Sequence, residues 1–90
     1  MKTAEELRKE MKGMTPEQAV SHLSAYLKEN PGDDGALTLR GLKYWSLGRR
    51  ADAINDYLAA LEINPESKAK QAMQATYDIL DYYNKDLYNP

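Results

Sequence analysis

The chain of 90 residues contains no cysteine and a single histidine. Without cysteine it can form neither a disulfide nor a thiolate metal site, so side-chain packing alone must stabilise the fold. His22 has no second histidine or cysteine to share a metal with, and we predict that it is a surface residue. No nucleophile–base set, glycine-rich phosphate loop or zinc-type spacing is present. The sequence therefore predicts no cofactor and no enzymatic activity.

Long apolar runs and strongly basic segments are also missing. The N-terminal residues alternate charges with single apolar side chains, which is not the pattern of a signal peptide, and no stretch is long enough to span a membrane. The formal charge is −2, and no basic cluster stands out beyond Arg49–Arg50. Nucleic-acid binding is therefore not indicated. We expect a cytoplasmic protein whose partners are neither nucleic acid nor membrane.

Capping and helix-breaking residues divide the chain into five predicted helices without any strand signal. A capping box at Thr15–Gln18 opens one helix, which ends at Asn30-Pro31-Gly32. The other predicted boundaries are an opening helix near 3–12, a helix from Asp33 or Asp34 to Gly48, one from Arg49–Arg50 to Asn64-Pro65, and a last one from Ser67 toward Tyr83. Short connections between such helices favour an all-α, antiparallel array.

The sequence also repeats itself. Pro31 and Pro65 lie 34 residues apart, and the same offset places Ala19 on Ala53 and Leu27 on Leu61. A 34-residue period with two helices per unit is typical of the tetratricopeptide repeat. Residues 34–67 resemble one nearly complete repeat, of the type found in small bacterial proteins. The positions that match the pattern of helix packing within a repeat are Leu37, Gly41, Tyr44, Ala53, Tyr57, Ala60 and Pro65.

The resemblance implies a single domain over residues 1–90, an α-solenoid fragment. It would consist of a degenerate first repeat (1–33), the near-complete repeat (34–67), a capping helix (68–83) and a tail (84–90). Arg40 departs from the pattern, because leucine is common there. We expect its stem to pack and its charge to lie in water.

Leu39, Leu42 and Trp45 form a second apolar stripe, at i, i+3 and i+6, on the first helix of this repeat. The resemblance places the stripe toward the concave groove of the family. Together with Arg8 and Thr38 it forms the predicted partner-binding groove. We predict an interaction module or adaptor that binds a peptide or protein segment there. A self-associating structural protein, with the groove and the C-terminal tail in a homodimer interface, is the alternative.

Two further features bear on these alternatives. Relatives that bind the C-terminal carboxylates of chaperones use basic and amide side chains at set positions, which correspond here to Ala4, Arg8, Leu39, Ala69 and Met73. Only Arg8 suits that chemistry, so a carboxylate clamp is not expected. The aromatic tail Tyr82–Tyr88 is either a self-docking or dimer-forming segment or a frayed helical end.

Overall fold

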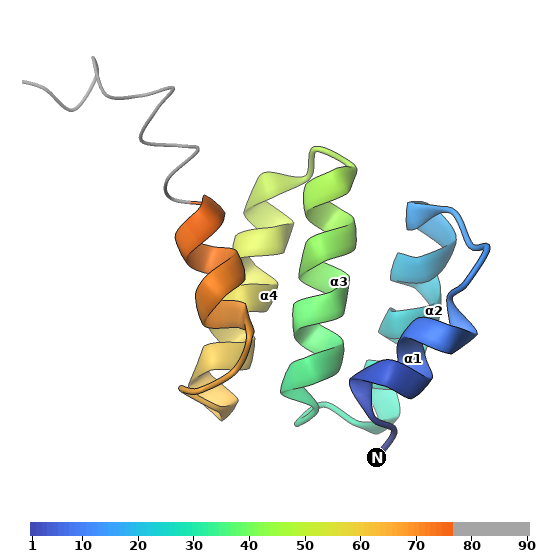
Figure 1. Cartoon of the computed structure of the whole chain (residues 1–90), viewed down its shortest axis with the longest axis horizontal. Helices are drawn as coiled ribbons and strands as arrows, with labels where there is room; N and C mark the ends of the chain where they lie inside the picture. Colours follow the sequence, from blue (N-terminus) through green and yellow to red (C-terminus); the bar gives the residue numbers. More distant parts are fainter. Residues whose placement is uncertain (77–90) are drawn as a thin grey trace, which may run out of the picture.

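The computed structural model describes residues 1–76 (Figure 1). It contains α1 (Ala4–Glu10), α2 (Pro16–Glu29), α3 (Asp34–Ser46), α4 (Arg50–Ile63) and a further helical segment over 69–76, without any strand among these residues. The predicted all-helical array of five helices is therefore confirmed. Residues 77–90, which hold the end of the predicted capping helix and the tail Tyr82–Tyr88, lie outside the described residues. None of the helices within 1–76 is both long and apolar enough to cross a membrane.

Side-chain caps fix where the helices begin. The Thr15 hydroxyl accepts a hydrogen bond from the Gln18 N–H (3.2 Å), and the Gln18 side chain accepts one from the Thr15 N–H (3.0 Å). The predicted capping box is thus present. Asp33 caps α3, since its Oδ1 accepts a hydrogen bond from the Ala36 N–H (3.1 Å). Each cap satisfies backbone donors that a helix would otherwise leave unpaired, and so defines a sharp turn between neighbouring helices.

A Schellman motif ends α3 and reverses the chain. Gly48 has φ +77°, a left-handed conformation that glycine adopts without steric cost. Its N–H donates to the Trp45 carbonyl (3.0 Å), and the Arg49 N–H donates to the Tyr44 carbonyl (2.9 Å). Because α4 begins at Arg50, the two helices of the repeat are antiparallel and close together.

The helices α2, α3, α4 and the segment 69–76 lie side by side, whereas α1 crosses at an angle (Figure 1). Backbone contact is most extensive between α3 and α4, smaller between α2 and α3, and smallest between α1 and α3. One core runs through the array. Its buried members are Leu7, Met11, Ala19, Leu23, Leu27, Ala36, Leu37, Leu39, Ala53, Tyr57, Ala60, Ala69 and Met73.

The contact between α3 and α4 depends on small residues. A Cβ atom on Gly41 would lie 2.5 Å from Cε1 of Tyr57 and 3.2 Å from the Ala53 carbonyl oxygen. Tyr57, Ala53 and Ala60 are all completely or almost completely buried. The absence of a side chain at Gly41 therefore allows the tyrosine ring to lie directly against the backbone of α3.

The other residues predicted to pack within the repeat differ in burial. Leu37 is 8% exposed. Tyr44 is half-buried, and the guanidinium of Arg49 lies 4.8 Å from the centre of its ring, a cation–π contact. Pro65 is exposed in the turn that follows α4. It contributes to the end of the helix rather than to the packed interior.

Arg40 does not leave its charge in water, so that expectation is wrong. Its Nε and one terminal nitrogen donate to the two carboxylate oxygens of Asp56, both at 2.8 Å, and its other nitrogen donates to Ser24 Oγ at 3.1 Å. Asp56 is only 6% exposed. The hydrogen bonds to the Asp56 carboxylate raise the pKa of the Arg40 guanidinium above its ordinary value. One side chain of α3 thus joins α2 to α4.

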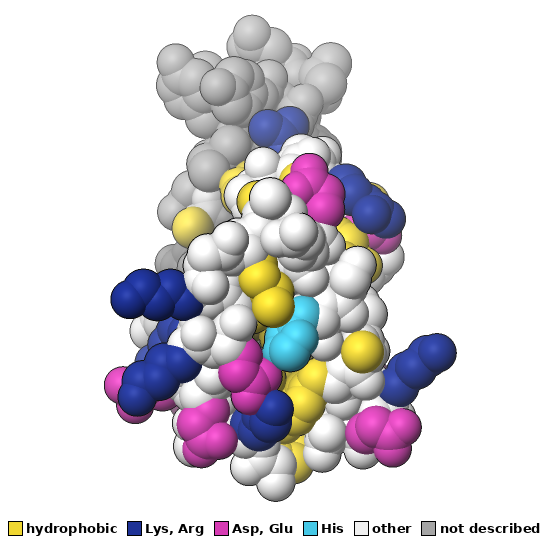
Figure 2. Space-filling model, turned by 90° about the vertical axis from the view of Figure 1, so that its right-hand side faces the viewer, with side chains coloured by type: hydrophobic (Ala, Val, Ile, Leu, Met, Phe, Trp, Pro, Cys, Tyr) yellow, Lys and Arg dark blue, Asp and Glu magenta, His cyan; other side chains and the backbone are white. Residues whose placement is uncertain are grey.

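Side-chain hydrogen bonds hold α1 in place. The Lys2 N–H donates to Tyr26 Oη (2.9 Å), and that hydroxyl donates to Asp33 Oδ2 (2.6 Å), the residue that caps α3. Glu10 bonds to the Lys2 ammonium and lies 2.8 Å from His22 Nε2. These bonds lower the pKa of the Glu10 carboxyl. The histidine (cyan) is visible on this flank of the molecule, beside apolar and acidic side chains (Figure 2).

Tyr57 should make the packing between α3 and α4 dependent on pH. Burial, and then the nearby Asp56 carboxylate, raise the pKa of its phenol above the ordinary value of 10.0. Its contribution to stability is complete below that value and is lost as the pH rises through the higher pKa of the folded state. Tyr57→Phe conserves volume, so it should change the free energy of unfolding by less than about 1.5 kcal/mol at neutral pH.

Above pH 10 the free energy of unfolding should fall less steeply with pH in the variant than in the parent protein. The two slopes should differ by up to about 1.4 kcal/mol per pH unit. Urea unfolding followed by circular dichroism, at neutral pH and at several alkaline values, measures this difference. Parallel stability curves for the two proteins would show that the phenol is accessible to water in the folded state.

Candidate partner-binding groove

Two adjoining hollows lie on the face formed by α1, α3 and the chain that follows α4. The first, of about 590 Å³, lies between α1, the turn after it and α3. The second, of about 570 Å³, lies between α1, α3 and residues of the 64–72 segment. Arg8, Leu39 and Leu42 line both. We call the two hollows together the groove.

The floor of the groove is apolar and held rigidly. Leu39 is 4% and Met11 7% exposed, so both belong mainly to the core. Thr38 is also buried, and its hydroxyl donates to the Asp34 carbonyl (2.8 Å) and lies 3.3 Å from Ser67 Oγ. This contact joins α3 to the start of the last helical segment. Since α3 is packed on both sides, the floor exists before any partner binds.

Leu42 is the most exposed of the large apolar side chains that line the groove. It is 43% exposed, and Met14, at the other side of the first hollow, is 36% exposed. Both belong to a small group of large apolar side chains exposed in the described part of the chain: Met1, Met14, Leu42, Leu58 and Ile63. Leu42 and Met14 thus leave apolar surface accessible on two sides of the first hollow.

Four of the five predicted groove residues line the second hollow together, namely Arg8, Thr38, Leu39 and Leu42. Trp45 lies one turn farther along α3 and lines neither hollow. It is half-buried against the core, and the Arg50 guanidinium lies 5.2 Å from the centre of its ring.

Several lining residues were absent from the prediction. Met11, Lys12 and Met14 lie at the end of α1 and in the turn after it, whose path the sequence pattern does not determine. Lys43 follows Leu39 by four residues, and this helical spacing could have placed it beside the stripe. Gln71, on the opposite wall, depends on how the last helical segment docks.

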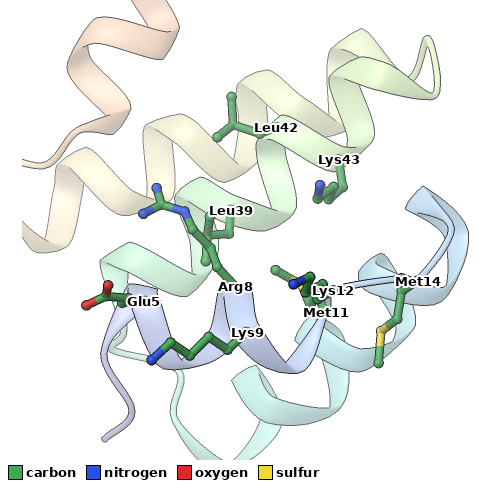
Figure 3. A pocket seen from close by; sticks show the side chains of 10 residues that line it. Glu5, Arg8, Lys9, Met11, Lys12, Met14, Leu39, Leu42 and Lys43 are labelled. Atoms are coloured by element: carbon green, nitrogen blue, oxygen red, sulfur yellow. The ribbon is translucent and has the colours of Figure 1, made fainter.

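Positive charge surrounds the first hollow. Its lining includes one acidic side chain, Glu5, and four basic ones, which we call the basic rim: Arg8, Lys9, Lys12 and Lys43. Figure 3 shows Arg8 and Lys12 on the α1 side and Lys43 on α3. No residue of the basic rim forms an ion pair with another residue of the described range 1–76.

The second hollow is electrically balanced. Arg8 and Lys68 are its basic residues, and Asp34 and Glu66 are its acidic ones. Nowhere in residues 1–76 do three potential metal ligands gather. The groove therefore combines an apolar floor, hydrogen-bonding groups and a charge that differs between its two hollows.

The family model for the tetratricopeptide repeat matches residues 35–67. No curated protein and no solved structure matches the chain significantly. The predicted resemblance is confirmed: the chain contains a tetratricopeptide repeat, a unit that serves in general as a protein–protein interaction module. The matched residues include α4 and nearly all of α3, and hence both leucines of the groove.

Proposed function

We propose that the groove binds a short segment of another protein. The observation that carries this proposal is the position of Leu42, an exposed leucine where two hollows with a common, rigid floor meet. A bound segment would cover Leu42 with an apolar side chain and place its polar groups toward the walls. Because the floor is already formed, binding would not require the repeat to reorganise.

Leu42 is also a suitable position for a test, because its side chain is partly in water. Leu42→Asp should leave the fold intact, since exposed substitutions usually change stability by less than about 0.5 kcal/mol. Buried anchors of an interface commonly contribute at least about 2 kcal/mol, so affinity should fall roughly 30-fold or more. Leu58→Asp is the matched control, because Leu58 is 50% exposed on α4 and lines neither hollow.

The ligands for this test come from a displayed library of random peptides selected on the parent protein. Affinities of the selected peptides for the two variants are then compared by fluorescence anisotropy, and thermal melting confirms that both variants fold. If the selected peptides bind the Leu42 variant as tightly as they bind the parent protein, the binding surface does not include Leu42.

The alternative function, a homodimer formed through the groove, makes a different prediction. Burial of Leu42 by a second copy would give a dimeric mass in light scattering, and Leu42→Asp would convert the protein to a monomer. If the parent protein is monomeric at high concentration and binds peptides through Leu42, the interaction module is supported and the homodimer is excluded.

A further inference from the structure

We infer that the partner is an acidic protein segment that carries at least one large apolar side chain, and that its acidic part lies over the first hollow. This inference rests on the proposed function and names the chemical class of its ligand. It depends on the basic rim and on the apolar residues within it.

The excess of positive charge at the basic rim is not shared by the rest of the described chain. Residues 1–76 contain equal numbers of basic and acidic side chains, eleven of each. The lining of the first hollow nevertheless has four basic side chains and one acidic one. The acidic residues that form ion pairs in this range, Glu10, Asp52 and Asp56, bond to other cations. The basic rim therefore keeps its charge for a ligand, and like charges held together favour an anionic partner.

The same hollow is apolar at its centre, where Leu39, Leu42 and Met11 contribute to the lining. A simple inorganic anion would leave the exposed side chain of Leu42 uncovered. A polypeptide with carboxylates beside a leucine or aromatic residue satisfies both the rim and the floor, because carboxylates pair with the lysines while the apolar side chain covers Leu42.

The difference in charge between the two hollows also determines which part of the bound segment lies in each of them. The second hollow has as many acidic as basic side chains, and Asp34 lies at its wall. Additional carboxylates there would meet a like charge, so the neutral or polar end of the segment belongs in that hollow. Specificity thus comes from attraction at one end and from the absence of attraction at the other.

The test uses the full chain and three labelled synthetic peptides of equal length. One alternates glutamate with leucine in one half and glutamine with leucine in the other half, and the other two replace every glutamate with glutamine or with lysine. Anisotropy titrations at low and high salt should show tightest binding by the glutamate peptide and a marked loss of that preference at high salt, because the charges lie at the surface. Lys12→Glu/Lys43→Glu should weaken glutamate-peptide binding about tenfold, since each exposed charge pair contributes a few-fold.

Lys28→Glu is the control, because Lys28 is an exposed lysine of α2 that lines neither hollow. It should bind the glutamate peptide as the parent protein does.

Equal binding of the glutamine and glutamate peptides would overturn the inference. If that binding were still lost in Leu42→Asp, the proposed function would stand. No binding of the glutamate peptide would also overturn the inference. Tighter binding of a peptide with the sequence of residues 77–90 would assign the groove to this chain's own segment.

Discussion

Asp56→Ala should lower the free energy of unfolding by about 3–5 kcal/mol, the usual consequence of removing one partner of a buried ion pair. Asp56 is almost fully buried on α4 and receives two hydrogen bonds from Arg40. Its loss would leave a guanidinium, only 21% exposed in its side chain, without the carboxylate that compensates its desolvation. For a domain whose total stability is about 5–15 kcal/mol, this loss is severe.

Asp52→Ala provides the control on the same helix. Asp52 pairs with Arg49, but both side chains are about half exposed. Exposed pairs contribute about 0–1 kcal/mol, so this variant should remain close to the parent protein. Urea denaturation followed by circular dichroism measures both variants. A loss below about 1 kcal/mol for Asp56→Ala would mean that water reaches the Arg40–Asp56 pair in solution.

A double variant separates the charge effect from the packing effect. Arg40 stands where leucine is common in the repeat, so Arg40→Leu/Asp56→Leu replaces the buried pair with apolar side chains. Such replacements are often neutral or stabilising, whereas Arg40→Leu alone leaves a buried carboxylate unpaired. We therefore expect the double variant to be more stable than either Asp56→Leu or Arg40→Leu. Additive losses would show that the two residues are not coupled.

This ion pair also shows where prediction from the sequence stopped. The sequence placed the helices correctly because their boundaries depend on local chemistry, such as the Thr15–Gln18 capping box and the left-handed Gly48. The partner of Arg40 depends on how two helices face each other. A signal was nevertheless present, since Asp56 lies three residues after Ala53 and four before Ala60, on the buried side of α4.

The residues of the groove, like the contacts of Arg40, were predictable only in part. Thr38, Leu39 and Leu42 share one face of α3, so helical periodicity was enough to group them. Only Arg8 of the basic rim was predicted, because Lys12 lies in the turn after α1 and its approach to Lys43 depends on the angle at which α1 crosses the array. Tertiary hydrogen bonds such as those of Tyr26 hold α1 at that angle, and the sequence pattern does not predict them.

Gly41→Leu should destabilise the protein by about 1–3 kcal/mol, the usual cost of overpacking, and Gly41→Ala should cost less. Two effects oppose each other at this position. Replacing a helical glycine with alanine ordinarily stabilises a helix by up to about 1 kcal/mol. Here the added Cβ would lie 2.5 and 2.8 Å from two ring carbons of Tyr57. Tyr57 is 1% exposed and its ring lies in the packed core, so the steric effect should dominate.

Gly32→Ala is the control for this steric argument, because a Cβ atom there would meet nothing within 4 Å. It should leave the stability unchanged or raise it by up to about 1 kcal/mol through the entropy of the unfolded chain. Thermal melting distinguishes the outcomes, since 1 kcal/mol corresponds to about 4–8 °C in a domain of this size. A melting temperature that rises in Gly41→Ala or Gly41→Leu would contradict the close contact between α3 and Tyr57. It would also remove the physical reason for a glycine in the middle of α3.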